Sequence, residues 1–243
     1  MIKPIDLNAD LGEGGSRDRD LMALVSSVNI ACGGHAGDKE TIQRTIELAL
    51  QAQVAIGAHP GYADPENFGR KSMHLSSADI RSLIHRQLDR ILQIQPHLHH
   101  VKPHGALYNQ ANQDRSIAAA VVAAIVELQP DTILYCPPTG ELINAATEIN
   151  LPTCAEGFID RRYQKDGNLC PRSEPDAVIE DATKAVSQAL EIANQETVTT
   201  LNDATIPLKA RTLCVHGDSP EAVAILRLAR KSLEEAGILI SAP

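Results

Sequence analysis

The chain has no tryptophan and only two phenylalanines and four tyrosines among its 243 residues, so we expect aliphatic layers to build its interior. Its five cysteines are scattered, odd in number and without a CxxC pair. This argues against a disulfide framework or a structural zinc site and indicates reduced thiols in a cytoplasm. The sequence therefore predicts a cytoplasmic protein whose stability comes from a hydrophobic core.

Basic residues and long apolar runs are also scarce. The 22 Lys and Arg residues form no long basic run and are outnumbered by 31 Asp and Glu, so we expect no nucleic-acid partner. The longest apolar run, residues 117–126, is half of the roughly 20 residues that span a bilayer. The first residues turn acidic at once and lack the apolar stretch of a signal peptide, so we expect no membrane association.

What the chain does contain is an alternation of short β-type runs with longer stretches of helical period. The expected strands are residues 5–8, 28–31, 54–57, 100–102, 132–135, 153–156 and 212–215. This order predicts an α/β fold, a parallel seven-stranded (β/α) barrel in one domain over residues 1–243. Between residues 197 and 210, two β-like runs flank Asn202 and Asp203, which predicts a small β-hairpin insert before the last strand.

Polar and titratable side chains gather directly after the strands. They include Asn8, Asp10, Glu13, His35, His59, His104, Tyr108, Glu156, Asp160 and His216. Parallel barrel strands all point their C-terminal ends to one face, where active sites form. Six of the seven expected strands thus deliver ionisable groups into one basin, and we interpret that basin as the functional site.

Some of these residues have plainer interpretations. Asp38 before a helix is a typical N-cap. His97, His99 and His100 precede the fourth strand, and we expect them in a solvated loop on the opposite face. We expect Cys32 to be a buried structural thiol because no base can be assigned to it. The His and carboxylate set could bind a divalent metal, but without an HExxH pair this remains open.

The chain resembles the LamB/YcsF family in motifs spread over nearly its whole length. These are DLNADLGE at residues 6–13, NIACGGHAGD at 29–38, GAHPG at 57–61, FGR at 68–70, VKPHGALYN at 101–109, EGFIDR at 156–161 and CVHGD at 214–218. The sequence departs from the family pattern at Ala9, Lys71 and Arg211, where family members often have Cys, Arg and Asp. After Glu13, the usual longer Ser/Phe-Gly sequence is missing. None of the charged strand-end residues is lost.

The resemblance implies a TIM-like barrel of the glycoside hydrolase/deacetylase type. It also implies the role of the A component of a prokaryotic 5-oxoprolinase, an enzyme that opens the lactam of 5-oxo-L-proline to L-glutamate with ATP. The 5-oxoprolinase subunits B and C are the implied partners. The chain has no GxxxxGK(S/T) loop, so we expect ATP and Mg²⁺ to bind with or on those subunits.

Lactam opening needs a positioned water, a proton for the leaving nitrogen and a grip on the substrate carboxylate. For proton transfer we predict residues at the mouths of five strands: Asp10, His59, His104, Glu156 and His216. For substrate binding we predict Asn8, Asn29, His35, Arg70, Lys102, Tyr108, Asp160 and Arg162. Lys102, Arg70 and Arg162 are the cations expected to hold the carboxylate, and Arg161 is suited to the same task.

Two other functions fit the same residues. One is a metal-dependent carbohydrate deacetylase on the same fold, with Asp10, His35 and His59 as ligands. The other is a scaffold subunit that binds substrate or partners while the chemistry occurs elsewhere. Metal analysis separates the first from a lactam hydrolase, and mutation of His104 or Glu156 separates the second.

Overall fold

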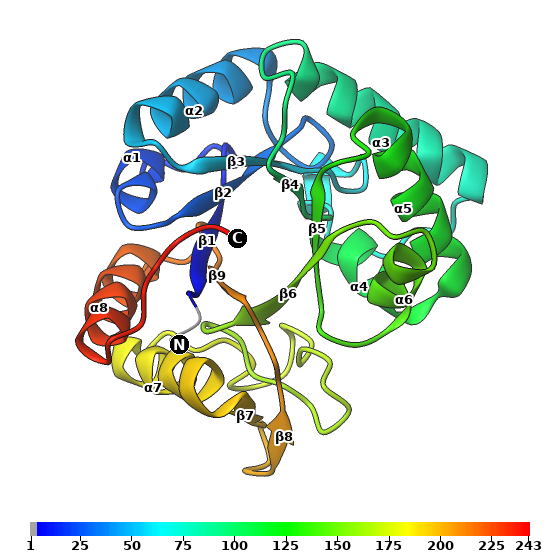
Figure 1. Cartoon of the computed structure of the whole chain (residues 1–243). Coiled ribbons are helices and arrows are strands. Elements are labelled where there is room, and N and C mark those ends of the chain that lie inside the picture. Colours follow the sequence, from blue (N-terminus) through cyan, green and yellow to red (C-terminus); the bar gives the residue numbers. More distant parts are fainter. Residues whose placement is uncertain (1–3) are drawn as a thin grey trace.

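In the computed structural model, which describes residues 4–243, seven parallel strands close into a barrel (Figure 1). Neighbouring strands follow the chain order, and the last strand pairs with the first. The strands are β1 (Asp6–Leu11), β2 (Ser27–Ala31), β3 (Ala55–His59), β4 (His100–Val101), β5 (Ile133–Cys136), β6 (Thr153–Phe158) and β9 (Thr212–Val215). Each overlaps a strand expected from the sequence, so the predicted seven-stranded barrel is confirmed.

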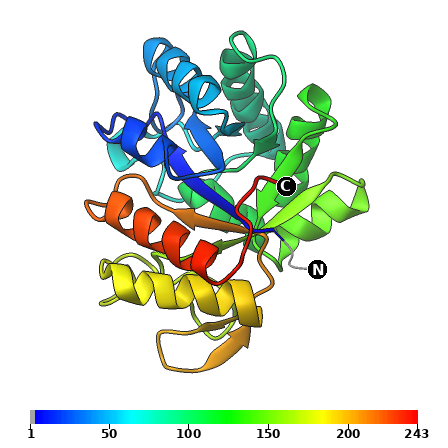
Figure 2. The ribbon, with the colours of Figure 1, turned by 60° about the vertical axis from the view of Figure 1, so that its left-hand side comes forward.

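Helices surround the barrel and lie between successive strands (Figure 2). They are α1 (Asp18–Met22), α2 (Lys39–Ala52), α3 (Ser77–Leu92), α4 (Gly105–Gln113), α5 (Arg115–Leu128), α6 (Glu141–Glu148), α7 (Ala182–Gln195) and α8 (Ala222–Glu235), with a 3₁₀ turn at Pro65–Asn67. Asp38 caps α2 by accepting a hydrogen bond from the amide of Thr41, as predicted. Ser76 caps α3 in the same way.

The alternation of side chains along the strands separates an apolar layer from a polar lumen. In β1, Leu7, Ala9 and Leu11 belong to the hydrophobic core. The residues that alternate with them point into the barrel, since Asp6 reaches Tyr135 of β5 and Asn8 reaches Glu156 of β6. The expectation of an aliphatic interior therefore holds for the layer between strands and helices but is wrong for the lumen.

Two segments stand outside the regular barrel. Strands β7 (Thr197–Thr199) and β8 (Thr205–Pro207) form an antiparallel two-stranded sheet before β9. Arg211, which departs from the family pattern, lies beside this sheet with its guanidinium 3.5 Å from the Glu196 carboxylate. Residues 159–181, between β6 and α7, form a long loop held by two isolated β-bridges. That loop supplies one wall of the cavity described below.

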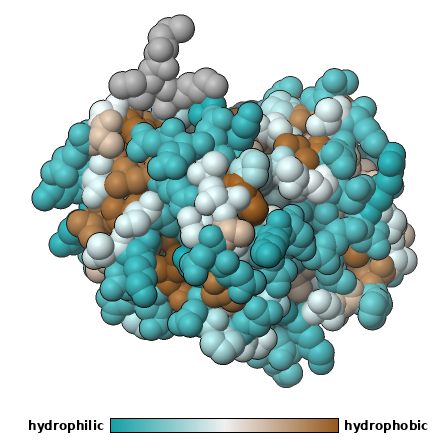
Figure 3. Space-filling view, turned by 90° about the horizontal axis from the view of Figure 1, so that it is seen from below, coloured by the Kyte–Doolittle hydropathy of each residue, from teal (hydrophilic) through white to brown (hydrophobic). Residues whose placement is uncertain are grey.

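Seen from below, the surface is mostly hydrophilic, with apolar residues showing in small areas between polar ones (Figure 3). Among residues 4–243, no helix combines the length and the apolar character needed to cross a membrane.

Candidate active site

A cavity of about 390 Å³ opens where the barrel strands end. Its lining includes Asp10, His59, Arg70, Lys102, His104, Tyr108, Phe158, Arg161, Arg172 and His216. These side chains come from β1, β3, β6, the first turns of α4 and the loops that follow β3, β4, β6 and β9. The strand ends therefore bring together four of the five residues predicted for proton transfer.

Lys102 lies at the floor of this cavity as a buried ammonium. Its Nζ is 3.0 Å from Asp10 Oδ1 and 2.8 Å from Glu156 Oε1. Burial works against the charge, but Asp10, Cys214 and Glu156 hold the pKa of Lys102 well above its usual value. Burial also opposes ionisation of Asp10, yet His59 and Lys102 keep the pKa of Asp10 well below its usual value. The floor is thus a charged group of one cation and two carboxylates.

Glu156 and the two asparagines hold that floor rather than face the main cavity. Asn8 donates to Glu156 Oε1 at 3.0 Å, and Tyr108 donates to Glu156 Oε2 at 3.0 Å. Asn29 donates to Asp10 Oδ1 at 2.8 Å. Asn8 and Asn29, which we predicted to bind substrate, are fully buried and do not line the cavity, so their contact with substrate stays a prediction. Glu156 lines a smaller adjoining pocket beside Tyr108.

His59 and His104 face each other with an unusual pairing of ring nitrogens. Nδ1 of His59 donates to the carbonyl of Lys102 at 2.7 Å, and Nε2 of His104 donates to the carbonyl of Phe68 at 2.9 Å. A neutral imidazole carries one N–H, so the two remaining nitrogens both present lone pairs. Those nitrogens, His59 Nε2 and His104 Nδ1, are 2.9 Å apart. Two neutral rings would repel at this distance, so a cation belongs between them.

Glu13 and His35 complete a cluster around this pair. Glu13 Oε1 is 2.9 Å from His35 Nε2 and 3.6 Å from His104 Nδ1. Burial and the charge of Asp10 raise the pKa of Glu13 to about 7, whereas burial lowers the pKa of His35 to about 4. The His35 ring stacks on His104 at 3.6 Å between centroids. His35, which we predicted to bind substrate, is therefore shielded from the cavity by His104.

His216 forms a second acid–base unit across the cavity. Its Nδ1 is 2.9 Å from Asp160 Oδ2, and its backbone amide donates to the same oxygen at 2.9 Å. Burial opposes ionisation of Asp160, but His216 keeps the pKa of Asp160 below its usual value. The carboxylate orients the His216 ring, and a direct contact of Asp160 with substrate stays a prediction. An Asp-oriented imidazole at a cavity wall suits general acid–base chemistry.

Three arginines supply positive charge at the cavity wall. Arg70 pairs with Asp218 at 2.5 Å, whereas Arg161 and Arg172 come from the loop at residues 159–181. Arg162, which we predicted to bind substrate, does not line the cavity, and its guanidinium donates to the carbonyl of Thr200. Arg161 and Arg162 are neighbours in an extended segment, so their side chains leave on opposite sides, and only Arg161 faces the cavity.

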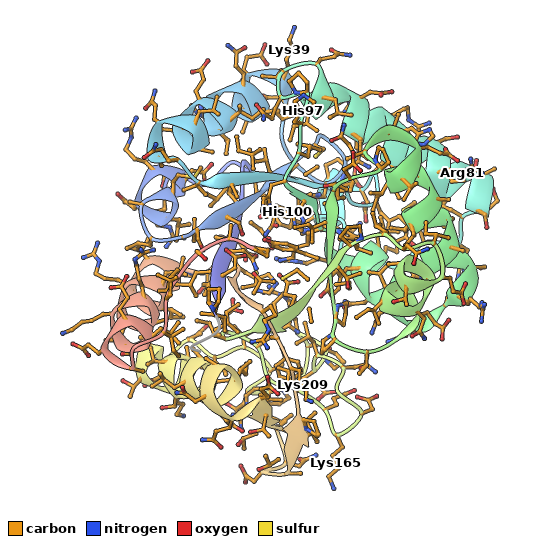
Figure 4. The ribbon with its side chains drawn as sticks, viewed as in Figure 1. Lys39, Arg81, His97, His100, Lys165 and Lys209 are labelled. Atoms are coloured by element: carbon orange, nitrogen blue, oxygen red, sulfur yellow. The ribbon has the colours of Figure 1, made fainter. Side chains whose placement is uncertain are left out.

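His100 also departs from expectation. It lies in β4 at the centre of the barrel, whereas His97 is at the periphery (Figure 4). The side chain is fully buried, is stacked on Tyr135 at 3.9 Å between centroids, and its Nε2 is 2.7 Å from Asn29 Oδ1. The expected solvated loop is therefore wrong for His100 and right for the exposed His97. Cys32 is buried, as expected, and burial raises the pKa of its thiol to about 12.

Sequence reasoning assigned no role to two residues that the structure brings to the site. Glu13 follows Gly12, whose φ of 74° requires glycine and turns the chain after β1. The signal for Glu13 was its place in the DLNADLGE motif at a strand end. Arg172 lies in the loop at residues 159–181 and gave no periodic signal.

Comparison with known proteins identifies the family of the chain and agrees with the barrel fold. Residues 5–243 match the LamB/YcsF family. A lactam utilization protein from Thermus thermophilus is 37% identical, with a TM-score of 0.91 over 99% of this chain and 100% of that one. A deacetylase solved with its substrate is 14% identical, with a TM-score of 0.53 over 98% of this chain and 87% of that one.

A more distant structure shares the fold alone. An N-acetylneuraminic acid synthetase from Leptospira borgpetersenii is 10% identical, with a TM-score of 0.51 over 97% of this chain and 86% of that one. Function cannot be transferred at this distance, because one barrel fold supports many chemistries.

Proposed function

The chain belongs to the LamB/YcsF family, and from this premise we propose that it is the lactam-opening component of a 5-oxoprolinase. The reaction is the hydrolysis of 5-oxo-L-proline to L-glutamate, coupled to hydrolysis of ATP to ADP and phosphate. The observation that carries the proposal is the full-length similarity to a lactam utilization protein at 37% identity. Five buried, unpaired cysteines fit a cytoplasmic setting.

The cavity has a group for each task of lactam opening. The substrate is a small anion, and Arg161 and Arg172 are the cations on the wall whose charge is least neutralised by close carboxylates. Lys102 is less suited to this task than predicted, because Asp10 and Glu156 already surround its ammonium. We therefore assign the substrate carboxylate to the two arginines, which can bind it through paired N–H groups.

Proton transfer falls to the histidines on opposite sides of the cavity. His216, oriented by Asp160, is placed to protonate the leaving ring nitrogen. The His59 and His104 pair, beside Asp10 and Glu13, is placed to orient the attacking water and receive its proton. The products balance: water attacks the carbon of the phosphorylated lactam and the C–N bond breaks, which leaves an amine and an acyl phosphate. A second water then cleaves the acyl phosphate to the carboxylate and free phosphate.

ATP is required because a five-membered lactam is a stable amide, and phosphorylation of its oxygen makes the carbon more reactive. Phosphoryl transfer depends on loops, Lys and Mg²⁺ that position the phosphates. The sequence has no recognisable phosphate-binding loop, so we propose that ATP and Mg²⁺ bind with or on partner subunits B and C. The cavity of this chain then receives the activated lactam.

The test is an assay of glutamate and ADP from 5-oxoproline, ATP and Mg²⁺. We expect no turnover by the purified chain and turnover after both partner subunits are added. Robust production of both products by the chain alone would contradict the partner requirement. No glutamate with both partners present would contradict the proposed reaction.

One observation keeps a second function in view. Glu13, His35, His59 and His104 each offer a ligand atom, and these atoms lie within 4.8 Å of one another. Such a cluster would also serve a metal-dependent deacetylase on this fold. Release of acetate from N-acetylated sugars by the chain without ATP would favour that function over lactam opening.

A further inference from the structure

The inference concerns the cation that belongs between His59 and His104. Both rings are fixed by backbone carbonyls, which accept hydrogen bonds from His59 Nδ1 and His104 Nε2. The free nitrogens then converge at 2.9 Å within the barrel mouth, where both side chains are at most 4% exposed. Either a proton shared by the two rings or a metal ion can satisfy both lone pairs.

The surroundings favour a metal ion over a shared proton. Metal-ligating histidines almost always donate their other N–H to a carbonyl or carboxylate, and both rings do so here. A carboxylate oxygen of Glu13 lies 3.6 Å from His104 Nδ1, and Asp10 Oδ2 lies 3.4 Å from His59 Nε2. Three classes of contact thus converge: two imidazoles, their carbonyl supports and carboxylates on two sides.

The ligand chemistry identifies the type of ion. Two imidazoles and one carboxylate form a known three-ligand set for Zn²⁺, and imidazole nitrogen also suits other late divalent transition metals. Ca²⁺ and Mg²⁺ prefer oxygen ligands and fit less well. His35 donates from Nε2 toward Glu13 Oε1 and so orients the carboxylate.

We propose that His59 Nε2, His104 Nδ1 and Glu13 Oε1 bind one divalent transition-metal ion of the zinc class, with Asp10 as the nearest additional carboxylate. His59 and His104 line the cavity, so a water or a substrate oxygen could reach an ion held between them. An ion of this type supplies Lewis-acid polarisation or a more acidic water. The inference concerns what the cluster binds and holds whether or not lactam opening is the reaction.

The experiment measures metal binding by the full chain without substrate or partners. The protein is stripped with a chelator and titrated with Zn²⁺, and then separately with Co²⁺, whose visible absorption reports its ligands. We expect one ion per chain, a rise in Tm with Zn²⁺ and a new absorption band with Co²⁺. Nitrogen NMR of the histidine rings should show the His59 and His104 signals shift on Zn²⁺ addition.

Variants separate this site from other histidines. His104→Gln and Glu13→Gln should each weaken binding at least about 100-fold, because even loss of a supporting residue costs 10–100-fold. His216→Gln is the matched control: it removes a histidine from the same cavity and should leave binding unchanged. Circular dichroism checks that each variant is folded.

Two results would overturn the proposal. One is a wild-type chain that binds neither ion and shows one doubly protonated ring in the nitrogen spectrum, since a proton is then the bridging cation. The other is wild-type affinity in both folded variants, since the ion then binds elsewhere. The NMR titration of the wild type decides the question even where a variant fails to fold.

Discussion

The two ends of the barrel lumen are both polar, yet they differ in how their polar atoms are satisfied. At the N-terminal end, the Asp6 carboxylate accepts hydrogen bonds from the hydroxyl groups of Ser26, Ser27, Tyr135 and Thr212 at 2.6, 2.7, 3.0 and 2.6 Å. All four donors are neutral hydroxyl groups, and each is paired with a carboxylate oxygen of Asp6. This end is a closed network that fills the lumen.

The C-terminal end combines charged groups, facing lone pairs and empty space. Lys102 forms ion pairs with Asp10 and Glu156. The ring nitrogens of His59 and His104 face each other, and both side chains line a cavity of about 390 Å³. The comparison shows that buried polar residues in a barrel do not by themselves mark a functional site. A functional site is marked instead by hydrogen-bond donors and acceptors that lack partners beside a cavity.

The largest effect on turnover is expected when a side chain is removed from the cavity end of the lumen. His104→Gln should lower kcat about 10²–10⁴-fold in the complete system with 5-oxoproline, ATP and both partners, as expected for loss of an acid–base group. Glu156→Gln is the companion variant, because it removes a carboxylate that pairs with Lys102 in the floor of the cavity. Near-wild-type turnover in both folded variants would show that this chain is a scaffold and the chemistry occurs elsewhere.

The second test concerns stability and the charged floor of the cavity. Lys102→Met leaves Asp10 and Glu156 buried without their cation, which should lower the free energy of unfolding by about 3–5 kcal/mol. Denaturant unfolding at neutral pH measures the change. Lys102→Arg is the matched control, because it keeps the positive charge and places a larger guanidinium group in the same space.

The pH dependence of this variant follows from the same charges. In the wild type, Lys102 has a raised pKa, so its contribution is present at neutral pH and is lost as the pH rises through that value. Without Lys102, the effect of burial, which raises the pKa of Asp10, loses one of the charges that oppose it in the folded state. The folded variant then takes up a proton at Asp10 more readily than the wild type does, so the stability difference between the wild type and the variant should shrink as the pH falls below 7. A stability difference that stays constant or grows over that range would contradict the assignment.

The sequence predicted the architecture because the barrel repeats one simple pattern seven times. Short apolar runs alternate with amphipathic helices, and their strand ends carry Gly, His and acidic residues. The chemistry of the lumen was harder to predict. Which alternate residues of a strand face inward depends on the barrel register, so His100 was expected in solvent although it stacks inside on Tyr135.

The candidate site was predictable where strands position the side chains and less so where loops do. Asp10, His59, His104 and His216 follow strand ends and all line the cavity. Arg161 and Arg162 are adjacent in sequence, and only three-dimensional structure shows which of the two faces inward. Arg172 comes from a long loop with no helical or strand period, so no pattern could place it.

The third prediction compares Arg172, which lines the cavity, with Arg162, which does not. Arg172→Gln should raise the KM for 5-oxoproline about 10-fold or more with little change in kcat, since a charge-assisted hydrogen bond contributes about 1.5–3 kcal/mol. Arg162→Gln is the control, because its side chain points to Thr200 outside the cavity. Steady-state kinetics of the complete system measure both. A larger KM effect at Arg162 would overturn the assignment of the substrate carboxylate.

The smallest expected effect lies at the closed end of the lumen. Tyr135→Phe removes the hydroxyl that donates to Asp6 Oδ2 at 3.0 Å but keeps the ring stacked on His100. Three hydroxyl donors to Asp6 remain, so the carboxylate stays satisfied and the loss should be about 1 kcal/mol in the free energy of unfolding. Denaturant unfolding measures that loss, and kinetics should show unchanged kcat and KM. A drop in kcat beyond a fewfold, with stability preserved, would mean that the closed network acts on the reaction and that the two ends of the lumen are coupled.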